Sequence, residues 1–167
     1  METITLGGGC FWCTEAVYLR LPGVKSVVSG YAGGSSKNPT YKEICTGTTG
    51  HAEVIRVEFD PEVIGLSKIL EVFWLSHDPT TLNRQGNDIG TQYRSVVFYE
   101  NETQKEIVLE SKRQHAFLYP DPIVTEVSPI PQFYPAEDYH QNFFELNPNN
   151  PYCNYVIPSK LKKLGLL

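Results

Sequence analysis

The chain has 167 residues, of which 41% are hydrophobic and 20% charged, a composition typical of one globular domain and not of a disordered chain. Its formal net charge is −5 and it holds no basic run, which argues against nucleic acid or an anionic membrane as the main partner. The sequence contains no apolar run of about 18 residues and no charged-then-apolar leader, so we predict neither a membrane span nor a secretory signal and expect a cytoplasmic location.

The N-terminal stretch predicts a strand, a tight turn and a helix around one cysteine. Residues 3–6 alternate polar and apolar side chains, and the glycines at 7–9 permit a sharp turn. A helix is expected from Phe11 until Pro22-Gly23. Cys10 is therefore predicted at the helix N-terminus, where the helix dipole and free N–H groups would lower its pKa below the ordinary value of roughly 8.5 and favour the nucleophilic thiolate.

The rest of the chain predicts further strands and helices in alternation. Periodicity favours strands at 24–31, 51–60, 93–99 and 123–127, helices at 66–74 and 103–118, and polar loops at 35–50 and 80–92. This order is typical of an α+β two-layer sandwich with a ferredoxin-like core, in which helices cover one face of a mixed sheet.

The last 40 residues differ in character, because prolines recur from Pro129 to Pro158. Helical patterning remains only at about 136–146. We therefore expect a single domain, 1–167, in which residues 128–167 form a long irregular tail that wraps the sandwich.

Four cysteines, Cys10, Cys13, Cys45 and Cys153, are too few and too unevenly spaced for a secreted disulfide scaffold. Cys10 and Cys13 form a C-x-x-C pair, a pattern found in dithiol redox pairs and in zinc sites. A zinc site needs a second ligand pair, and the other cysteines and the histidines are scattered without one. The residues leave open a thiol enzyme, including a peroxidase, and a dithiol or zinc interaction module without turnover.

Other side chains allow a functional and a purely structural interpretation. Glu53 could be a partly buried proton donor with a raised pKa or an exposed residue at the end of a strand. Phe11 and Trp12 could line an apolar pocket or simply fill the core. The phenols of Tyr41 and Tyr93 lie in polar loops and could serve as hydrogen-bond donors.

Nine short motifs occur in a fixed order along the chain. They are Gly9-Cys10-Phe11-Trp12, Gly30-Tyr31-Ala32-Gly33-Gly34, Pro39-Thr40-Tyr41, Cys45-Thr46-Gly47, Gly50-His51-Ala52-Glu53, His77-Asp78-Pro79, Gly86-Asn87-Asp88, Gln92-Tyr93-Arg94-Ser95 and Ala136-Glu137-Asp138-Tyr139-His140-Gln141. Over essentially its whole length the chain resembles the peptide-methionine (S)-S-oxide reductases, the A-type enzymes that reverse methionine oxidation.

The resemblance implies a role for each matching position. Cys10 matches the nucleophile that attacks the sulfoxide sulfur and becomes a sulfenic acid as methionine leaves. Glu53 matches the acid that protonates the oxygen, for which its carboxyl group must be neutral. Tyr41 and Tyr93 match two phenols that hydrogen-bond the oxygen, and Asp88 matches a carboxyl group in the same network. Phe11 and Trp12 match two aromatic walls around the substrate methyl group.

The resemblance also implies how the enzyme is recycled. Cys13 departs from the commonest form of the family, which has glycine there, and Pro151-Tyr152-Cys153 resembles a resolving segment. We expect Cys153 to resolve the sulfenic acid before Cys13 does, and we can assign no role to Cys45. The expected partners are free or protein-bound methionine-(S)-sulfoxide and thioredoxin as reductant, with no metal or organic cofactor and a monomeric chain.

Overall fold

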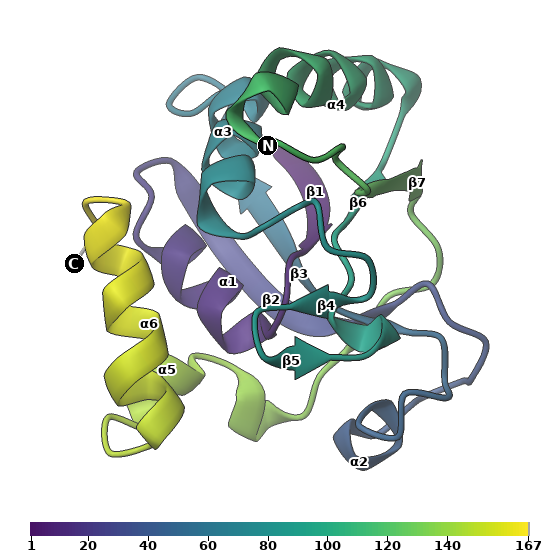
Figure 1. The fold of residues 1–167 in the computed structure, drawn as a ribbon, viewed down its shortest axis with the longest axis vertical. Coiled ribbons are helices and arrows are strands. Elements are labelled where there is room, and N and C mark those ends of the chain that lie inside the picture. Colours follow the sequence, from purple (N-terminus) through teal and green to yellow (C-terminus); the bar gives the residue numbers. More distant parts are fainter. Residues whose placement is uncertain (167) are drawn as a thin grey trace.

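The fold is built on a six-stranded sheet with the strand order β7-β6-β1-β3-β2-β8, seen in a computed structural model (Figure 1). The structure describes residues 1–166, and the side chains of residues 152–154 lie outside that description. The strands of this sheet are β1 (Glu2–Gly7), β2 (Val24–Ala32), β3 (Ala52–Phe59), β6 (Val96–Tyr99), β7 (Glu126–Pro129) and β8 (Tyr134–Pro135). A separate hairpin is formed by β4 (Arg84–Gln85) and β5 (Asp88–Ile89).

The helices vary from single turns to four turns. They are α1 (Phe11–Leu19), α2 (Tyr41–Ile44), α3 (Leu66–Ser76), α4 (Glu102–His115), α5 (Phe143–Leu146) and α6 (Pro151–Lys163), with 3₁₀ turns η1 (Thr91–Tyr93), η2 (Ala116–Leu118) and η3 (Asp138–His140).

The predicted α+β sandwich is confirmed, including its ferredoxin-like core. The central strands β6-β1-β3-β2 pair antiparallel, and α1 and α3 connect β1 to β2 and β3 to β6. Strand β7 runs parallel to β6, which makes the sheet mixed.

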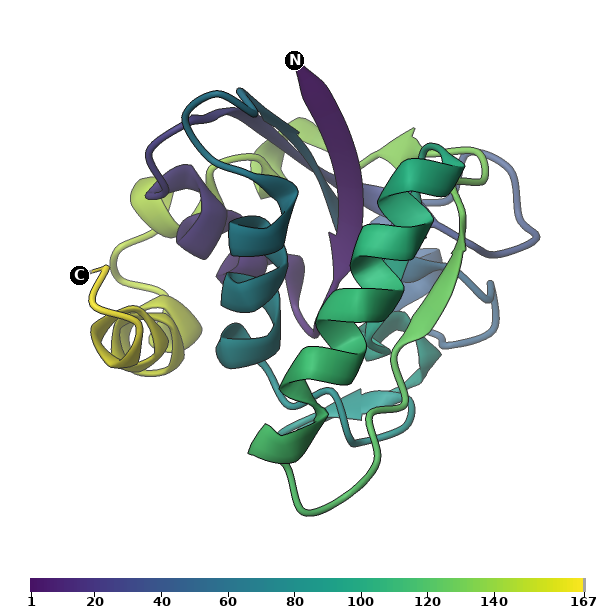
Figure 2. The same ribbon diagram turned by 90° about the horizontal axis from the view of Figure 1, so that it is seen from above.

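The period of two along β3 divides its side chains between two faces of the sheet. Ile55, Val57 and Phe59 are buried in the main core, to which α1, α3, α4 and α6 also contribute. Figure 2 shows α3 and α4 side by side in this helical layer. Val54 faces the opposite side and packs in a second, smaller cluster with Phe133. Glu53 has the same parity as Ile55, so the strand itself directs the carboxyl group toward the helices.

The two predicted loops contain short elements that the periodicity did not indicate. Helix α2 begins with a capping box, in which the Thr40 side chain accepts from the Glu43 N–H and Glu43 accepts from the Thr40 N–H. This signature stands in the sequence, but one helical turn is too short to produce a hydrophobic period. The hairpin β4-β5 lies in the other loop, and β7 begins at Glu126, three residues later than the strand expected from Ile123.

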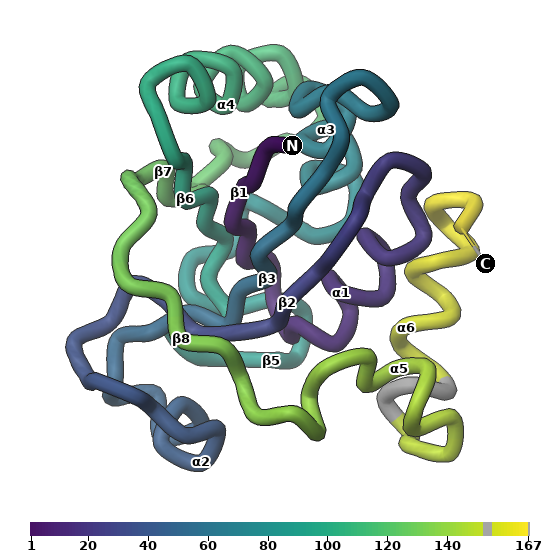
Figure 3. The backbone as a smooth tube through the Cα atoms, turned by 180° about the vertical axis from the view of Figure 1, so that it is seen from behind, coloured from purple at the N-terminus to yellow at the C-terminus, as the bar shows by residue number. Residues whose placement is uncertain are grey.

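The expectation of a long irregular C-terminal tail is wrong for its last part, which forms α6. Pro151 occupies the first turn, where a missing N–H is harmless, and Pro158 lies inside the helix. Ile157 and Leu161, four residues apart, are fully buried in the main core, and this burial stabilises the helix in spite of Pro158. Within the preceding segment, β8 pairs with β2 (Figure 3).

Candidate active site

Cys10 lies between β1 and α1, at the N-cap position of the helix, as predicted. Gly9 before it has a φ of +94°, and a Cβ there would come within 2.8 Å of the Gln85 side chain, so this turn requires glycine. The Cys13 N–H donates to the Cys10 carbonyl at 3.1 Å and closes the first helical turn. The Cys10 side chain is only 8% exposed.

Glu53 lies directly under the start of α1. Its Oε1 accepts the Phe11 backbone N–H at 3.2 Å, and the residue is 1% exposed. Its Oε2 is buried without a hydrogen-bond partner among the described residues. Burial raises the pKa of Glu53 to about 8, a trend that the Phe11 N–H opposes and the charge of Asp88 reinforces. Glu53 is therefore mostly protonated near neutral pH and can donate a proton.

The expectation that the helix N-terminus lowers the pKa of Cys10 is wrong for this structure. Burial raises the pKa of the thiol well above its ordinary value, and negative charge on Glu53 or Cys13 raises it further. The Trp12 N–H opposes this shift but does not outweigh it. The dipole effect is small beside the desolvation of a buried thiolate, and the Phe11 N–H is directed at Glu53. The resting site therefore holds a neutral thiol beside a neutral carboxyl group.

Three further predicted residues reach the same site from separate elements. Tyr41 begins α2, Tyr93 ends η1 and Asp88 begins β5. Burial, and then the charge of Glu53, raise the pKa values of both phenols, so that they remain neutral O–H donors. The charge of Asp88 also acts on Tyr93, Glu53 and Cys10. The structure thus brings together residues that are up to 83 positions apart, from Cys10 to Tyr93.

The two predicted aromatic walls differ in exposure. Phe11 is fully buried and Trp12 only half-buried. Phe11 stacks on Tyr41 with ring centroids 6.5 Å apart, and Trp12 lies 6.4 Å from the same ring. Trp12 thus reaches the surface beside Cys10, whereas Phe11 forms the floor behind it.

The remaining cysteines occupy unlike environments. Cys13 is 1% exposed and belongs to the main core, while Cys45 is exposed at the end of α2 and shares a side-chain hydrogen bond with Tyr41. Cys10, Cys13 and Cys45 are thiols and form no disulfide. The side chain of Cys153, the predicted resolving residue, lies outside the described residues.

A sequence model of the family described as peptide methionine sulfoxide reductase matches residues 2–165. The chain belongs to this family. The enzyme is 57% identical to peptide methionine sulfoxide reductase MsrA of Leptospira borgpetersenii over 98% of this chain and 93% of that protein. It therefore reduces methionine-(S)-sulfoxide to methionine, which decides among the activities that the residues alone left open.

Solved structures of related enzymes have the same fold. Reduced Mxr1 from Saccharomyces cerevisiae matches with a TM-score of 0.87 and 37% identity, covering 91% of this chain and 88% of that one. Mxr1 in complex with Trx2 matches with a TM-score of 0.61 and 26% identity, covering 85% and 84% of the two chains.

Sequence reasoning assigned no role to several polar residues that support this site. Both oxygens of Glu137 are engaged, Oε1 by the Tyr31 hydroxyl and Oε2 by the Tyr41 backbone N–H, each at 2.9 Å. The Gln85 amide pairs with the Asp78 backbone through two hydrogen bonds of 2.9 Å and so anchors the hairpin that carries Asp88. Glu137 stands in one of the nine motifs and Gln85 directly precedes another, but nothing in the sequence indicated which backbone groups they would bind.

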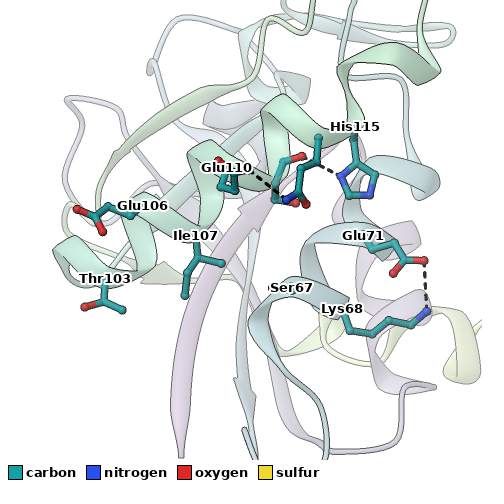
Figure 4. Close-up of a pocket in the computed structure, with 10 residues that line it drawn as sticks. Ser67, Lys68, Glu71, Thr103, Glu106, Ile107, Glu110 and His115 are labelled. Carbon is teal, nitrogen blue, oxygen red and sulfur yellow. Dashed lines mark hydrogen bonds and ion pairs between the residues drawn. The ribbon is translucent and has the colours of Figure 1, made fainter.

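A groove of about 590 Å³ between α3 and α4 lies apart from the cysteine site (Figure 4). Surface side chains line it, among them the ion-paired Lys68 and Glu71, and none of the predicted catalytic residues is among them. Among the side chains that the structure describes, no three potential ligands gather as a metal site, and no described helix is long and apolar enough to cross a membrane.

The pKa of Glu53 predicts a pH-dependent loss of stability that Glu53→Gln removes. The folded chain holds this proton up to a pKa of about 8, whereas the ordinary value is 4.5. Between these values the folded state binds more protons than the unfolded state, so the free energy of unfolding falls as the pH rises. Relative to Glu53→Gln, the wild type should lose stability from about pH 5 to about pH 8, and the difference should level off below about pH 4.

Urea unfolding of both proteins across this pH range measures the effect. Glu58→Gln, at an exposed position of the same strand, controls for the loss of a charge. A wild-type and Glu53→Gln difference that does not vary with pH would show that folding leaves the pKa of this carboxyl group at its ordinary value.

Proposed function

We propose that the reduction is carried out by Cys10 as nucleophile and Glu53 as proton donor, with Tyr41 and Tyr93 as hydrogen-bond donors and Asp88 supporting them. The observation that carries this assignment is the protonated, buried Glu53 carboxyl group with an unengaged oxygen beside a buried thiol. A sulfoxide oxygen is a poor leaving group, and it needs a proton and oriented donors as negative charge develops on it.

The proposed step begins when the sulfoxide oxygen accepts hydrogen bonds from Glu53 and the two phenols. The Cys10 sulfur attacks the substrate sulfur, the oxygen takes the Glu53 proton, and the thiol proton returns to the carboxylate. Transfer of the hydroxyl to Cys10 releases methionine and leaves a sulfenic acid. The methionine sulfur is reduced by two electrons, the Cys10 sulfur is oxidised by two, and Glu53 ends in the protonation state in which it began.

Substrate binding would overcome the raised pKa of the thiol. A sulfoxide that is protonated or strongly hydrogen-bonded places positive charge on its sulfur, next to Cys10. This charge favours the thiolate only when substrate is present, so the resting thiol is protected from unwanted oxidation.

Trp12 and Phe11 complete the proposed site on the side of the substrate methyl group. Their rings are apolar, whereas Glu53, Tyr41 and Tyr93 are polar, so the site is chemically asymmetric. An asymmetric site accepts one arrangement of oxygen, methyl group and side chain around the sulfur, which supports selection of the S epimer.

The partner that returns the enzyme to its reduced state is proposed to be thioredoxin. Mxr1, the yeast protein with the same fold, has been solved in complex with Trx2, which supports a thioredoxin as reductant here. We further propose that the chain acts as a monomer, because the assigned residues all belong to one chain, and that it works in the cytoplasm, where a reducing environment maintains thiols.

Cys10→Ser is expected to abolish turnover while the fold remains intact. No other described cysteine combines the helix N-terminus with contact to Glu53, so no thiol can substitute for it. Reduction of peptides that carry the S or the R sulfoxide, followed by chiral separation, measures both activity and epimer choice. Cys45→Ser serves as the matched control and should stay active; a folded Cys10→Ser that still reduces the S epimer, or equal loss of both epimers, would refute the assignment.

Glu53→Gln is expected to slow single-turnover methionine release on the order of 10²-fold or more, the usual range for loss of a general acid. The amide keeps the shape and a hydrogen-bond donor but cannot transfer a proton at a useful rate. Rapid-quench measurement of methionine release, without reductant, isolates this step from recycling. A near-normal rate would transfer the proton-donor role to the phenols or to water.

The sulfenic acid is expected to be resolved first by Cys153. Cys13 is buried and fixed in the helical core, and a disulfide with Cys10 would distort the first turn of α1. Residues 147–150, with one proline and three asparagines, lead into α6, and we propose that this turn lets the start of the helix, which carries Cys153, approach Cys10. Mass-spectrometric mapping after one equivalent of sulfoxide should find a Cys10–Cys153 disulfide, and Cys153→Ser should lose thioredoxin-driven turnover more than Cys13→Ser. A dominant Cys10–Cys13 bond with active Cys153→Ser would reverse this order.

A further inference from the structure

The orientation of the Trp12 indole is set by two contacts with the C-terminal segment. Its Nε1–H donates to His140 Nδ1 at 3.0 Å, and its ring stacks on Phe143 with centroids 3.7 Å apart and planes within 5°. Trp12 is otherwise half-exposed on a helix of nine residues. Stacking alone allows an aromatic ring to rotate in its own plane, and the hydrogen bond removes that freedom.

This hydrogen bond defines the protonation of His140. An indole N–H can only donate, so Nδ1 must carry a lone pair and the imidazole must be neutral, with its proton on Nε2. Nε2 is buried and has no hydrogen-bond partner among the described residues. A fold that leaves one ring nitrogen unsatisfied does so at a cost in stability, which indicates that the bond made by the other nitrogen has a use.

The His140 ring is held independently of the bond to Trp12. It is fully buried, with the rings of Tyr41 and Tyr139 at 4.3 and 4.1 Å and Phe11 at 5.2 Å between centroids. These rings leave the imidazole little room to turn. The acceptor, His140 Nδ1, therefore has a fixed position, and the Trp12 indole orients toward it.

The backbone on both sides of His140 has anchors of its own. The Gln141 amide pairs with the Ser29 backbone at 3.0 and 2.9 Å, and the Phe143 N–H donates to the buried carboxyl group of Glu15 at 3.2 Å. Replacing the imidazole should therefore alter the Trp12 contact without releasing the segment from the sheet.

We propose that His140 is a positioning residue for sulfoxide reduction, which fixes the Trp12 indole as the wall against which the substrate methyl group binds. This inference rests on the proposed function, in which Trp12 borders the substrate. The indole contacts the methyl group before and during the reaction, so a loosened ring weakens binding of substrate and transition state alike. Such uniform binding is seen in KM and hardly in kcat.

The same geometry makes the contact sensitive to acid. Protonated His140 would present an N–H toward the indole N–H, and the bond would break. The titratable groups around the ring are Tyr41 from α2 and Glu137 and Tyr139 from its own segment, while α1 and α5 contribute only rings to it. The pKa values of both phenols are raised and that of Glu137 is lowered. Burial lowers the pKa of His140 and the charge of Glu137 opposes this shift, so acid must go below the ordinary range of an imidazole to break the contact.

The test compares His140→Phe, which keeps a ring but offers no acceptor, with His140→Asn, whose amide oxygen can take the place of Nδ1. We expect His140→Phe to raise KM for an S-sulfoxide peptide roughly tenfold, the loss of about one hydrogen bond, with kcat within about twofold. His140→Asn should restore most of the KM. His115→Phe on α4, distant from the site, is the matched control and should behave as wild type.

Acrylamide quenching reports the indole directly, because Trp74 is fully buried and Trp12 is half-exposed. Quenching should increase in His140→Phe and remain normal in His140→Asn. Acidification should increase it in the wild type, and this step should be missing in His140→Asn. Should His140→Phe not fold, His140→Ala replaces it in the same comparison.

Unchanged KM and quenching in His140→Phe would overturn the proposal, and so would an equal loss in His140→Asn, which would indicate a purely structural ring. Failure of the proposed site is recognised separately. In that case Cys10→Ser would retain activity, whatever the His140 variants do.

Discussion

The hydrogen bond between the Phe11 N–H and the Glu53 carboxyl group is the contact on which this site depends. It joins the first turn of α1 to the central strand β3, and it does so in a place where Glu53 is 1% exposed. Burial keeps the carboxyl group protonated, and one backbone N–H satisfies one oxygen while the other remains unengaged. The same contact uses the helix N–H that would otherwise favour a Cys10 thiolate. The acid and the nucleophile are thus both held neutral by one arrangement, and substrate is needed to separate their charges.

The second support comes from the far end of the chain. Glu137 fixes the start of α2, and with it Tyr41, while Gln141 and Glu15 bind the segment to β2 and α1. The bonds to the backbone of Tyr41, Ser29 and Phe143 are independent of neighbouring side-chain identity, whereas the Ser29 hydroxyl joins Glu15 side chain to side chain. The segment from Glu137 to Phe143 therefore does more than cover the sheet. It carries the contacts that orient Tyr41 and Trp12 over a rigid sheet.

The third support is the hairpin that carries Asp88. Gln85 forms a pair of hydrogen bonds with the Asp78 backbone, and Arg94 donates to the carbonyls of Gly50 and Thr91. The loop between β2 and β3 and the segment between α3 and β6 are thereby tied together. Their lengths and composition are those of mobile loops, and their polar side chains replace the ladder bonds that a regular element would have.

Much of this protein was determined by its sequence alone. The period of two in β3 and the helical period in α3 and α4 predict the sandwich, because burial of an apolar face imposes those periods. The glycines before Cys10 and the apolar start of α1 place the thiol at the helix N-terminus for local steric reasons. The family motifs name Glu53, Tyr41, Tyr93 and Asp88 as one group, which the structure brings together.

Other features were decided only by tertiary structure. Helix α6 forms despite Pro158 because Ile157 and Leu161 find a core to enter, and no local rule contains that core. The raised pKa values of Cys10 and Glu53 have the same origin, since a pKa depends on what covers a group and not on its neighbours in the chain. His140 meets Trp12 across 128 residues. Periodicity and propensity describe a few residues at a time. The contacts that bury the groups of this site, shift their pKa values and orient their side chains therefore depend on the folded chain.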